Sequence, residues 1–520
     1  MNPNSLRICI LSHEYPPDTG WGGIATFAYH LAHGLVEIGH EVEVITLAKD
    51  EPREVIDHGV KVHHVLPYLK ETDLGLIWRA MPYSRVIFNW APALWKKLLE
   101  RHQTRPFDVI DAPELLGDAI LPTIGKIAPI VIRLYTPHSK FIAERFHNAS
   151  DSFDHQFMAM VERVAMVNAE AITSPSLDLA KFVASDLNIP LNDITLIANP
   201  IDAVKFNPEG AKAIESSDTL KVLFVGRLEE RKGIGYLVQA IPDVVRAVPN
   251  AHFYIIGDDT KNGPQQTSVL DGLKQFIAKA NCQPNVTFIN RVPLDDLPKY
   301  YRSADVCVVP SLYDNSPYTC LEAMSCGRVV VGTTSGGIGE YLVNGESGVL
   351  VEAKDASAIA QAVINLLRNQ DERRRLEVNA RQRVMEKFQR SEIARRTTAL
   401  YGLAIDRFRA RQESPLYTRD KARMLADLDD MMTGLNMMFH KLLWQHSYRY
   451  RVATLLHRIR TRPRLFVAEL MLKALKAPFG GESKNVNYPA LVVWLEKQIS
   501  AKHQAIVDAA GLSAVGQIER

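Results

Sequence analysis

The stretch at residues 305–327, DVCVVPSLYDNSPYTCLEAMSCG, restricts the fold of this chain more than any other. Its apolar run at 306–309 is short and β-branched, which is typical of a strand buried in a parallel sheet. Pro310 and Ser311 end the strand, and a polar loop leads to a helix predicted to begin at residues 319–324. Parallel strands need helical crossovers, so this stretch predicts a parallel sheet covered by helices.

Two carboxylates flank the predicted start of this helix. Asp314 lies in the polar loop, and Glu322 lies eight positions later in the first turns of the helix. The N-terminus of a helix carries backbone N–H groups that bind anions. A helix start between two carboxylates therefore suits a ligand with both phosphate and sugar hydroxyl groups. On this stretch alone, a simple connection in which Asp314 caps a turn explains the pattern equally well.

A second apolar strand, LKVLFVGRL at residues 220–228, leads into a basic turn and a helix. Arg227 and Lys232 then lie at the C-terminal edge of the predicted sheet. Two cations at this edge would stabilise the negative charge that a diphosphate gains when a sugar leaves it. The alternative is a basic surface turn, which the carboxylates of Asp314 and Glu322 further along the chain make less attractive.

The N-terminal part of the chain predicts a parallel βαβ unit. Strands are expected at 7–12 and 41–47, with a helix at 25–38 between them. Gly22 and Gly23 precede the helix, where glycine lets a backbone approach a ligand closely and leaves the helix start open to phosphate. A tight turn without a ligand is the alternative for this pair of glycines.

The overall composition is that of a large and nearly neutral protein. Its 520 residues suggest three or four domains, and its 61 basic and 59 acidic side chains predict no nucleic-acid partner. The five cysteines lack metal-ligand spacing, which predicts buried free thiols in a reducing compartment. We find no run of 18 apolar residues and no signal peptide. We therefore expect a cytoplasmic protein, with contact to the inner face of a membrane still open.

Taken together, these motifs resemble the retaining glycosyltransferases of family 4, the group of glycogen synthase and sucrose synthase. The family signature has two glutamates separated by seven residues, before a helix that ends in Ala-Met-x-Cys-Gly. Glu322 matches the second glutamate, and Asp314 replaces the first. Residues 225–233 contain the family's Val-Gly-Arg-Leu and Lys-Gly, and residues 336–340 match its Gly-Gly-x-x-Glu loop. The resemblance covers about residues 6–405.

The resemblance implies an α/β glycosyltransferase-B fold with two facing doubly wound Rossmann-like domains and a helical C-terminal extension. The implied parts are an acceptor-side domain at 1–208, a nucleotide-sugar donor domain at 209–385, a crossover helix at 386–410 and a basic helical extension at 411–520.

The resemblance also implies a reaction. A sugar would pass from a nucleoside diphosphate sugar to an acceptor hydroxyl with retention at the anomeric carbon, and the leaving phosphate would help to take the acceptor proton. Arg227 and Lys232 would hold the diphosphate. Glu322 would hold the ribose hydroxyls, and Asp314 those of the donor sugar. Further substrate contacts carried over are Gly22, Gly23, Asn290, Arg291, Ser316, Pro317, Tyr318 and Thr319. No cofactor and no metal is expected, because no Asp-x-Asp motif lies near the donor motifs.

The strand predicted at 129–135 departs from the family pattern. A histidine commonly ends this strand and points into the cleft beside the donor sugar. Here Tyr135 has that position, and His138 follows three residues later. We expect one of the two to line the active cleft. The alternative for His138 is an exposed loop histidine.

Two segments rich in basic and aromatic residues have more than one interpretation. Residues 78–105 suit a solvated helix better than an amphipathic segment lying on acidic lipid. Within 411–520, the stretch from Lys441 to Lys476 has nine basic residues and one acid, with aromatic residues interleaved. It could dock acidic lipid, a partner or nucleic acid, or serve as a helical cover or a dimerisation element. The sequence predicts no oligomeric state.

Two other classes of function fit the same motifs. One is a different cleft enzyme on the same fold, such as a nucleotide-sugar epimerase or a phosphorylase. The other is a non-catalytic scaffold that works through the basic extension. The presence of both cations and both carboxylates favours the transferase.

Overall fold

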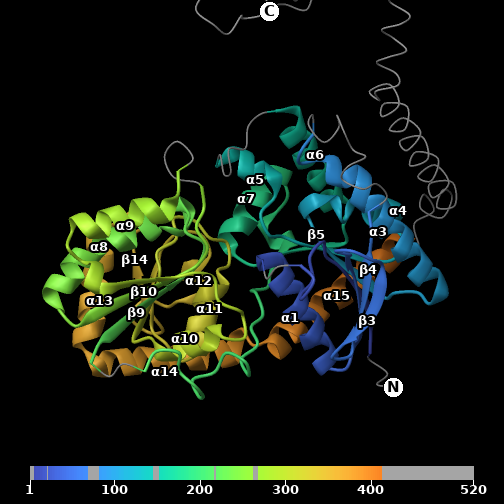
Figure 1. Cartoon of the computed structure of the whole chain (residues 1–520). Helices are drawn as coiled ribbons and strands as arrows, with labels where there is room; N and C mark the ends of the chain where they lie inside the picture. Colours follow the sequence, from blue (N-terminus) through green and yellow to red (C-terminus); the bar gives the residue numbers. More distant parts are fainter. Residues whose placement is uncertain are drawn as a thin grey trace, which may run out of the picture. The chain divides into compact units, whose positions relative to one another are not determined.

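The structure of the protein, a computed structural model, describes residues 5–19, 22–67, 81–144, 152–215, 218–261 and 267–412. These residues belong to one compact unit of the chain and form two α/β domains, each built on its own sheet (Figure 1). Apart from its first two residues, the predicted extension at 411–520 lies outside the described residues, and so do residues 78–80 of the first basic segment.

The first domain contains a sheet with the strand order β3-β4-β2-β1-β5-β6-β7-β8. Neighbouring strands are parallel except for β3 and β4, which are antiparallel. Ile8 in β1 lies opposite Val42 on one side and Val109 on the other, so β1 is buried within the sheet. The strands are β1 (Arg7–Leu11), β2 (Glu41–Leu47), β3 (Arg53–Asp57), β4 (Val60–Val65), β5 (Val109–Pro113), β6 (Ile130–Arg133), β7 (Ala171–Ser174) and β8 (Ile194–Leu196).

Helices connect the parallel strands of this sheet, as the parallel arrangement requires. They are α1 (Gly23–Glu37), α3 (Arg85–Thr104), α4 (Ile120–Gly125), α5 (His138–Ala143), α6 (Phe153–Asn168) and α7 (Leu177–Leu187). Trp90 and Trp95 on α3 are buried, and Trp90 donates a hydrogen bond to Asp118 at 2.8 Å. These two tryptophans therefore pack inside the domain and do not face lipid or solvent.

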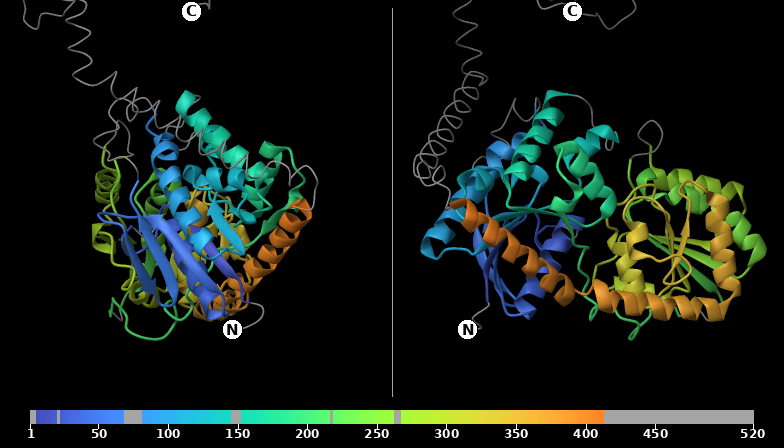
Figure 2. Two further views of the ribbon diagram at one scale, coloured as in Figure 1. Left: turned by 90° about the vertical axis from the view of Figure 1, so that its right-hand side faces the viewer. Right: turned by 180° about the vertical axis from the view of Figure 1, so that it is seen from behind.

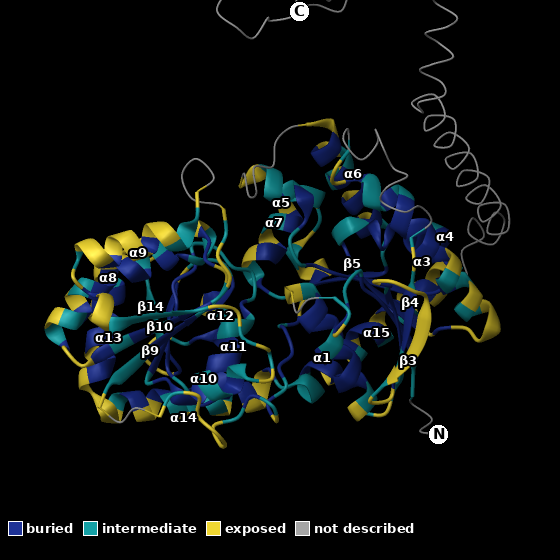
Figure 3. Cartoon of the chain, viewed as in Figure 1, coloured by how far each residue is buried: buried dark blue, intermediate teal, exposed yellow. Residues whose placement is uncertain are grey.

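The second domain contains a fully parallel sheet with the order β11-β10-β9-β12-β13-β14. Its strands are β9 (Leu220–Val225), β10 (Ala251–Ile256), β11 (Val286–Ile289), β12 (Val306–Val309), β13 (Val330–Thr333) and β14 (Val349–Val351). Its helices are α8 (Ile234–Ala247), α9 (Val269–Lys279), α10 (Leu297–Ser303), α11 (Tyr318–Ser325), α12 (Ile338–Tyr341), α13 (Ala356–Arg368) and α14 (Gln370–Lys387). Figure 3 shows buried residues along the sheet and exposed residues on the outward faces of α9 and α13.

Two consecutive helices connect the domains. α14 packs against α11 of the second domain, whereas α15 (Arg390–Gln412) packs against α1 and the sheet of the first domain (Figure 2). Between them, Ile201 donates to the carbonyl of Phe388 at 2.9 Å and accepts from Arg390 at 3.1 Å. Gly34 of α1 lets the start of α15 pack closely against α1, because a Cβ at this position would lie 2.6 Å from the carbonyl oxygen of Arg390.

The fold agrees with the sequence-based expectations at several points. The two parallel-sheet α/β domains are confirmed, the strand at 306–309 is β12, and the helix over 319–324 is part of α11. All five cysteines are free and buried, as expected. Within the described ranges, the helices include none with the length and apolar character that a membrane span requires.

Candidate functional site

The candidate site lies where β9 and β12 end. These strands are neighbours in the second sheet, so their C-terminal ends share an edge, where ligands of open α/β sheets bind. The turn after β9 and the loop after β12 are joined by a hydrogen bond from the Leu312 amide to the Arg231 carbonyl at 2.8 Å. The basic turn and the carboxylate loop predicted from separate motifs therefore form one site.

An ion pair between Lys232 and Asp314 lies at the centre of this site. The Lys232 ammonium donates a hydrogen bond to Asp314 Oδ2 at 2.5 Å, and Arg231 Nη1 lies 3.8 Å from the same oxygen. Burial alone would raise the pKa of Asp314, but the two cations outweigh it and hold this pKa below its ordinary value. Asp314 is therefore ionised at neutral pH.

A second carboxylate, Glu229, aligns the arginines of the turn. Its side chain is buried, and its Oε1 accepts a hydrogen bond from Arg231 at 2.9 Å and lies 3.4 Å from Arg227 Nη2. The side chain of Arg227 is 58% exposed and so remains available to a ligand. The three cations in contact with Glu229 and Asp314 outnumber these two carboxylates by one, which leaves a net positive charge for an anion.

Glycines allow the loops of the site to pack directly on one another. Gly233 has φ +68°, and a Cβ there would lie 1.8 Å from the carbonyl oxygen of Pro310 at the end of β12. A Cβ at Gly337 would lie 1.9 Å from the carbonyl oxygen of Asn315, and the Gly337 amide donates to the Asp314 carbonyl at 2.9 Å. Backbone contacts on two sides thus fix the loop that carries Asp314.

Glu322 lies on α11 and is 5% exposed. Its Oε2 accepts a hydrogen bond from the Tyr301 hydroxyl at 2.7 Å. Burial raises the pKa of Glu322 to about 7, and the hydrogen bond and the charges of Lys205 and Lys232 oppose this rise without cancelling it. At neutral pH Asp314 is therefore ionised and Glu322 only partly so, because the charges of nearby cations outweigh the effect of burial at Asp314 and do not outweigh it at Glu322.

The residues between Asp314 and Glu322 form the start of α11. The Ser316 hydroxyl contacts that of Tyr341, and the Ser316 carbonyl accepts a hydrogen bond from Asn199 of the first domain at 3.2 Å. Pro317 is the N-cap of α11. Tyr318 and Thr319 begin the helix, and the Tyr318 ring lies 6.2 Å from that of His30 on α1.

Tyr135 is one of the residues of the first domain that contact the carboxylate loop. Its carbonyl accepts a hydrogen bond from Asn315 Nδ2, which also donates to Thr136 Oγ1 at 2.5 Å. The Tyr135 amide in turn donates to the buried carboxyl of Glu114 at 2.8 Å. The end of β6 is thus joined to the loop after β12.

His138 lies elsewhere, at the start of α5. The alternative of an exposed loop histidine is wrong, because the residue is buried. Its Nε2 lies 2.9 Å from His155 Nδ1, and its amide donates to Glu162 Oε2 at 2.6 Å. Burial lowers the pKa of His138 to about 4. Its hydrogen bonds join it to α6, and its ring packs beside those of Tyr83 and Phe141. Tyr135, in contrast, contacts the carboxylate loop.

Among the residues that the structure describes, no hydrogen bond joins the remaining predicted contacts to this cluster. Gly22 is the N-cap of α1 and Gly23 its first residue, and both are exposed. Asn290 and Arg291 are exposed and follow β11 at the same edge of the second sheet as the site. They lie near the site in topology, because β11 is parallel to β10 and β9.

Sequence reasoning missed several residues that shape the site. Arg231, Glu229 and Asn315 contact the predicted residues directly, and Glu340 accepts a hydrogen bond from the Leu177 amide of the first domain at 2.6 Å. A signal existed for Arg231 and Glu229, which stand between the predicted cations, and for Glu340, which belongs to the Gly-Gly-x-x-Glu loop. None existed for Asn315, whose role depends on the neighbouring domain.

Comparisons with known proteins identify the class of protein. Residues 21–205 match the model of glycosyltransferase family 4, and residues 208–383 match that of glycosyl transferases group 1. The chain is 29% identical over 413 residues to an uncharacterised glycosyltransferase of Methanocaldococcus jannaschii, an alignment that covers 77% of this chain and 99% of the relative.

Solved structures agree on the fold. Sucrose-phosphate synthase of Thermosynechococcus elongatus aligns with a TM-score of 0.61 and 22% identity, over 76% of this chain and 98% of that protein. The Anabaena protein HepE in complex with UDP aligns with a TM-score of 0.56 and 18% identity, over 76% of this chain and 100% of HepE. This chain is a glycosyltransferase with the glycosyltransferase-B fold and is similar to family 4, and glycosyl transfer is its class of activity.

Proposed function

We propose that this glycosyltransferase moves a sugar from a nucleoside diphosphate sugar to an acceptor hydroxyl group, with retention at the anomeric carbon and without a bound metal at the donor site. The observation that carries the proposal is the contact between the basic turn 227–232 and the Asp314 loop, at the shared edge of β9 and β12. The similarity to the UDP-bound protein HepE supports a nucleotide donor.

The charges of the site support a diphosphate ligand. The cluster of Arg227, Arg231 and Lys232 with its two carboxylates has one excess positive charge. When the sugar leaves, negative charge grows on the diphosphate, and cations fixed in advance stabilise it without rearranging. Arg227, which is exposed, and Lys232 are the two groups we assign to this role.

The two carboxyl groups would hold hydroxyls of the donor. Asp314 is ionised and its backbone is fixed by Gly337, so it suits the sugar hydroxyls beside the diphosphate. Glu322 is assigned to the ribose. The acceptor would approach from the first domain, where Tyr135 adjoins the Asp314 loop through Asn315.

Calorimetric titration with UDP, GDP and ADP tests the donor site. We expect one of the three to bind with micromolar affinity to the wild type and to bind about 10- to 100-fold more weakly to Lys232→Ala, as loss of a charge-assisted hydrogen bond predicts. Lys274→Ala is the matched control, because Lys274 is an exposed lysine on α9 of the same domain. Equal loss in both lysine variants, or no binding of any nucleotide, would refute the donor assignment.

The stereochemistry needs a separate measurement. With the nucleotide known, its common donor sugars are supplied with candidate acceptors, and the anomeric configuration of the product is read from its NMR coupling constants. The proposal requires that the product have the same anomeric configuration as the donor sugar. An inverted product would overturn retention while leaving the donor site intact, and turnover that needs no separate acceptor would favour an epimerase.

A further inference from the structure

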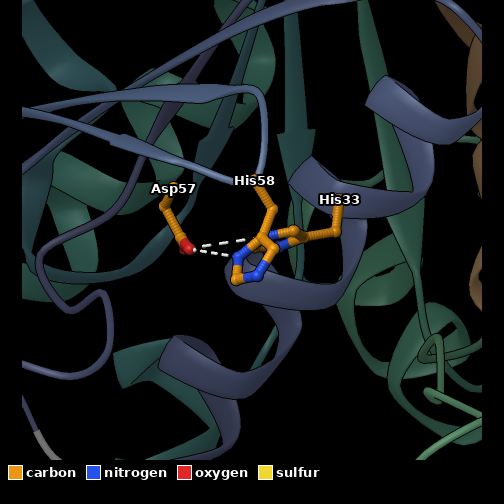
Figure 4. A group of neighbouring side chains, drawn as sticks. All are labelled: His33, Asp57 and His58. Carbon is orange, nitrogen blue, oxygen red and sulfur yellow. Dashed lines mark hydrogen bonds and ion pairs between the residues drawn. The ribbon is translucent and has the colours of Figure 1, made fainter.

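A cluster of two histidines and one aspartate lies in the first domain, outside the donor site. His33 is on α1, Asp57 ends β3, and His58 follows in the turn between β3 and β4. Figure 4 shows nitrogen atoms of both rings facing the Asp57 carboxylate. The three residues come from two separate elements, so the fold rather than local sequence brings them together.

The distances within this cluster suit a shared metal ion. Asp57 Oδ2 lies 3.4 Å from His33 Nε2, and Asp57 Oδ1 lies 2.8 Å from His58 Nδ1. The three candidate ligand atoms all lie within 4.8 Å of one another. A tetrahedral zinc ion with bonds of about 2.0–2.2 Å separates its ligand atoms by about 3.3–3.6 Å, so small adjustments would give binding geometry.

His33 is already oriented as a metal ligand. Its Nδ1 lies 2.7 Å from the Tyr29 carbonyl, an oxygen that can only accept, so Nδ1 carries the hydrogen and Nε2 keeps its lone pair. The side chain is 6% exposed, and Nε2 is buried without a hydrogen-bond partner in the described part of the chain. A lone pair 3.4 Å from a carboxylate oxygen is repelled unless a cation or a proton lies between them.

A hydrogen bond holds Asp57, and a tight turn holds the backbone of His58. The Tyr15 hydroxyl donates to Asp57 Oδ2 at 3.1 Å. His58 and Gly59 have φ +46° and +92°, which is typical of the two central residues of a type I′ hairpin turn. The His58 side chain is 81% exposed, so an ion can reach the cluster from solvent.

We propose that His33, Asp57 and His58 bind a divalent transition metal, with zinc the best-fitting ion and water completing its coordination. Imidazole nitrogen with one carboxylate suits zinc, whereas magnesium and calcium prefer oxygen ligands. The bound ion would fasten the β3–β4 hairpin at the edge of the first sheet to α1. This site is separate from the donor site of the second domain.

The test is calorimetric titration of the full chain with zinc chloride and, separately, magnesium chloride. We expect one zinc ion to bind with micromolar or higher affinity, no competing binding of magnesium, and a higher unfolding temperature in zinc, because an ion that binds the folded state stabilises it. Cobalt should bind at the same site and give the visible absorption bands of a low-coordinate complex. Failure of zinc to bind the wild type would overturn the proposal.

His58→Ala is the decisive variant, because an exposed side chain in a turn can be removed without disturbing the core. We expect zinc affinity to fall by at least about 10- to 100-fold and the cobalt bands to disappear. His252→Ala, which removes an imidazole from β10 of the second domain, is the matched control and should bind zinc like the wild type. Unchanged zinc binding in His58→Ala would overturn the proposal, because the zinc would then be bound without this cluster.

Discussion

At Glu322, burial raises the pKa of a group assigned to the donor, and the hydrogen bond from Tyr301 and the charges of two lysines cancel this rise only in part. Its pKa is raised to about 7, so the carboxyl group changes from mostly neutral to mostly ionised between pH 6 and pH 8. The ionised form accepts hydrogen bonds from two hydroxyls more strongly than the neutral form. Donor binding should therefore depend on pH in this range.

We predict that wild-type affinity for the nucleoside diphosphate sugar rises about tenfold from pH 6 to pH 8, because binding follows the ionised fraction of Glu322. Glu322→Gln keeps an oxygen that can accept from Tyr301 but cannot ionise, so its affinity should be lower and nearly constant with pH. Calorimetry with the intact sugar nucleotide is the measurement, since its diphosphate does not titrate here. Parallel pH curves for the two proteins would contradict the role of Glu322.

Glu114 in the first domain combines complete burial with backbone hydrogen bonds, one of them from the Tyr135 amide at 2.8 Å. Burial raises its pKa to about 8, above the ordinary value of 4.5. The folded protein therefore keeps a proton that the unfolded chain releases, so Glu114 lowers stability progressively as pH rises from about 4.5 to about 8, and its effect is constant above that.

We predict that Glu114→Gln gains stability relative to the wild type as pH rises through this window, reaching about 2–4 kcal/mol above pH 8 and little below pH 4.5. The amide keeps an acceptor for Tyr135 and has no charge to desolvate. Urea unfolding at pH 5 and pH 8.5 measures the difference. A difference that stays the same at both pH values would mean that Glu114 is ionised in the folded protein.

At the scale of the element, the start of α8 depends on one glycine. Gly233 has the left-handed φ of +68° and contacts the end of β12, so it places Lys232 beside the Asp314 loop. Gly235, two residues later in the same helix, would place a Cβ in open space. The two glycines therefore differ in what an added methyl group would meet.

We predict that Gly233→Ala lowers the free energy of unfolding by more than about 2 kcal/mol and weakens nucleotide binding, because the methyl group would overlap the Pro310 carbonyl. Gly235→Ala should be neutral or raise stability by up to about 0.5–1 kcal/mol, because alanine forms helix more readily than glycine. Thermal unfolding and nucleotide titration of both variants provide the comparison. If the two variants have similar stability and nucleotide affinity, the end of β12 must shift to make room for the methyl group at position 233.

At the scale of the whole described molecule, α15 joins the second domain to the core of the first. Ile393, Leu400 and Tyr401 of this helix belong to the apolar cluster around the first sheet. The Tyr401 hydroxyl donates to Asp111 Oδ2 at 2.8 Å, and Asp111 also forms a buried ion pair with Arg133 at 2.9 Å. α15 thus meets the sheet through apolar packing and through charged hydrogen bonds such as the one from Tyr401 to Asp111.

We predict that Tyr401→Phe lowers the free energy of unfolding by about 1.5–3 kcal/mol, the range for a hydrogen bond to a charged group in a buried place. Tyr236→Phe on α8, whose ring is partly buried against the second core, should change it by less than about 0.5 kcal/mol. Calorimetric unfolding of both variants is the measurement. If Tyr401→Phe leaves the free energy of unfolding unchanged, a water molecule must replace the lost hydrogen-bond donor to Asp111.

The fold could be predicted because its signals are local. Short β-branched strands such as 306–309, each followed by a polar loop and a helix, indicate parallel α/β units whatever lies around them. The sequence could also name Lys232 and Asp314, because both stand at strand ends, where parallel sheets collect ligand-binding residues. It could not assign Asn315 or choose between Tyr135 and His138, because Asn315 meets Tyr135 across two domains and His138 meets α6 only in the folded first domain.

By itself, the sequence determined the order of strands and helices, the two parallel sheets and the residue types at the site. Only the tertiary structure decided which groups touch: Lys232 with Asp314, 82 positions apart, and Asn315 with Tyr135, 180 positions apart. It also decided the burial that raises the pKa of Glu322 and the meeting of His33 with Asp57. Hydrophobic periodicity is a property of neighbouring residues, whereas charge and hydrogen bonding depend on whatever the packed chain places within a few ångströms.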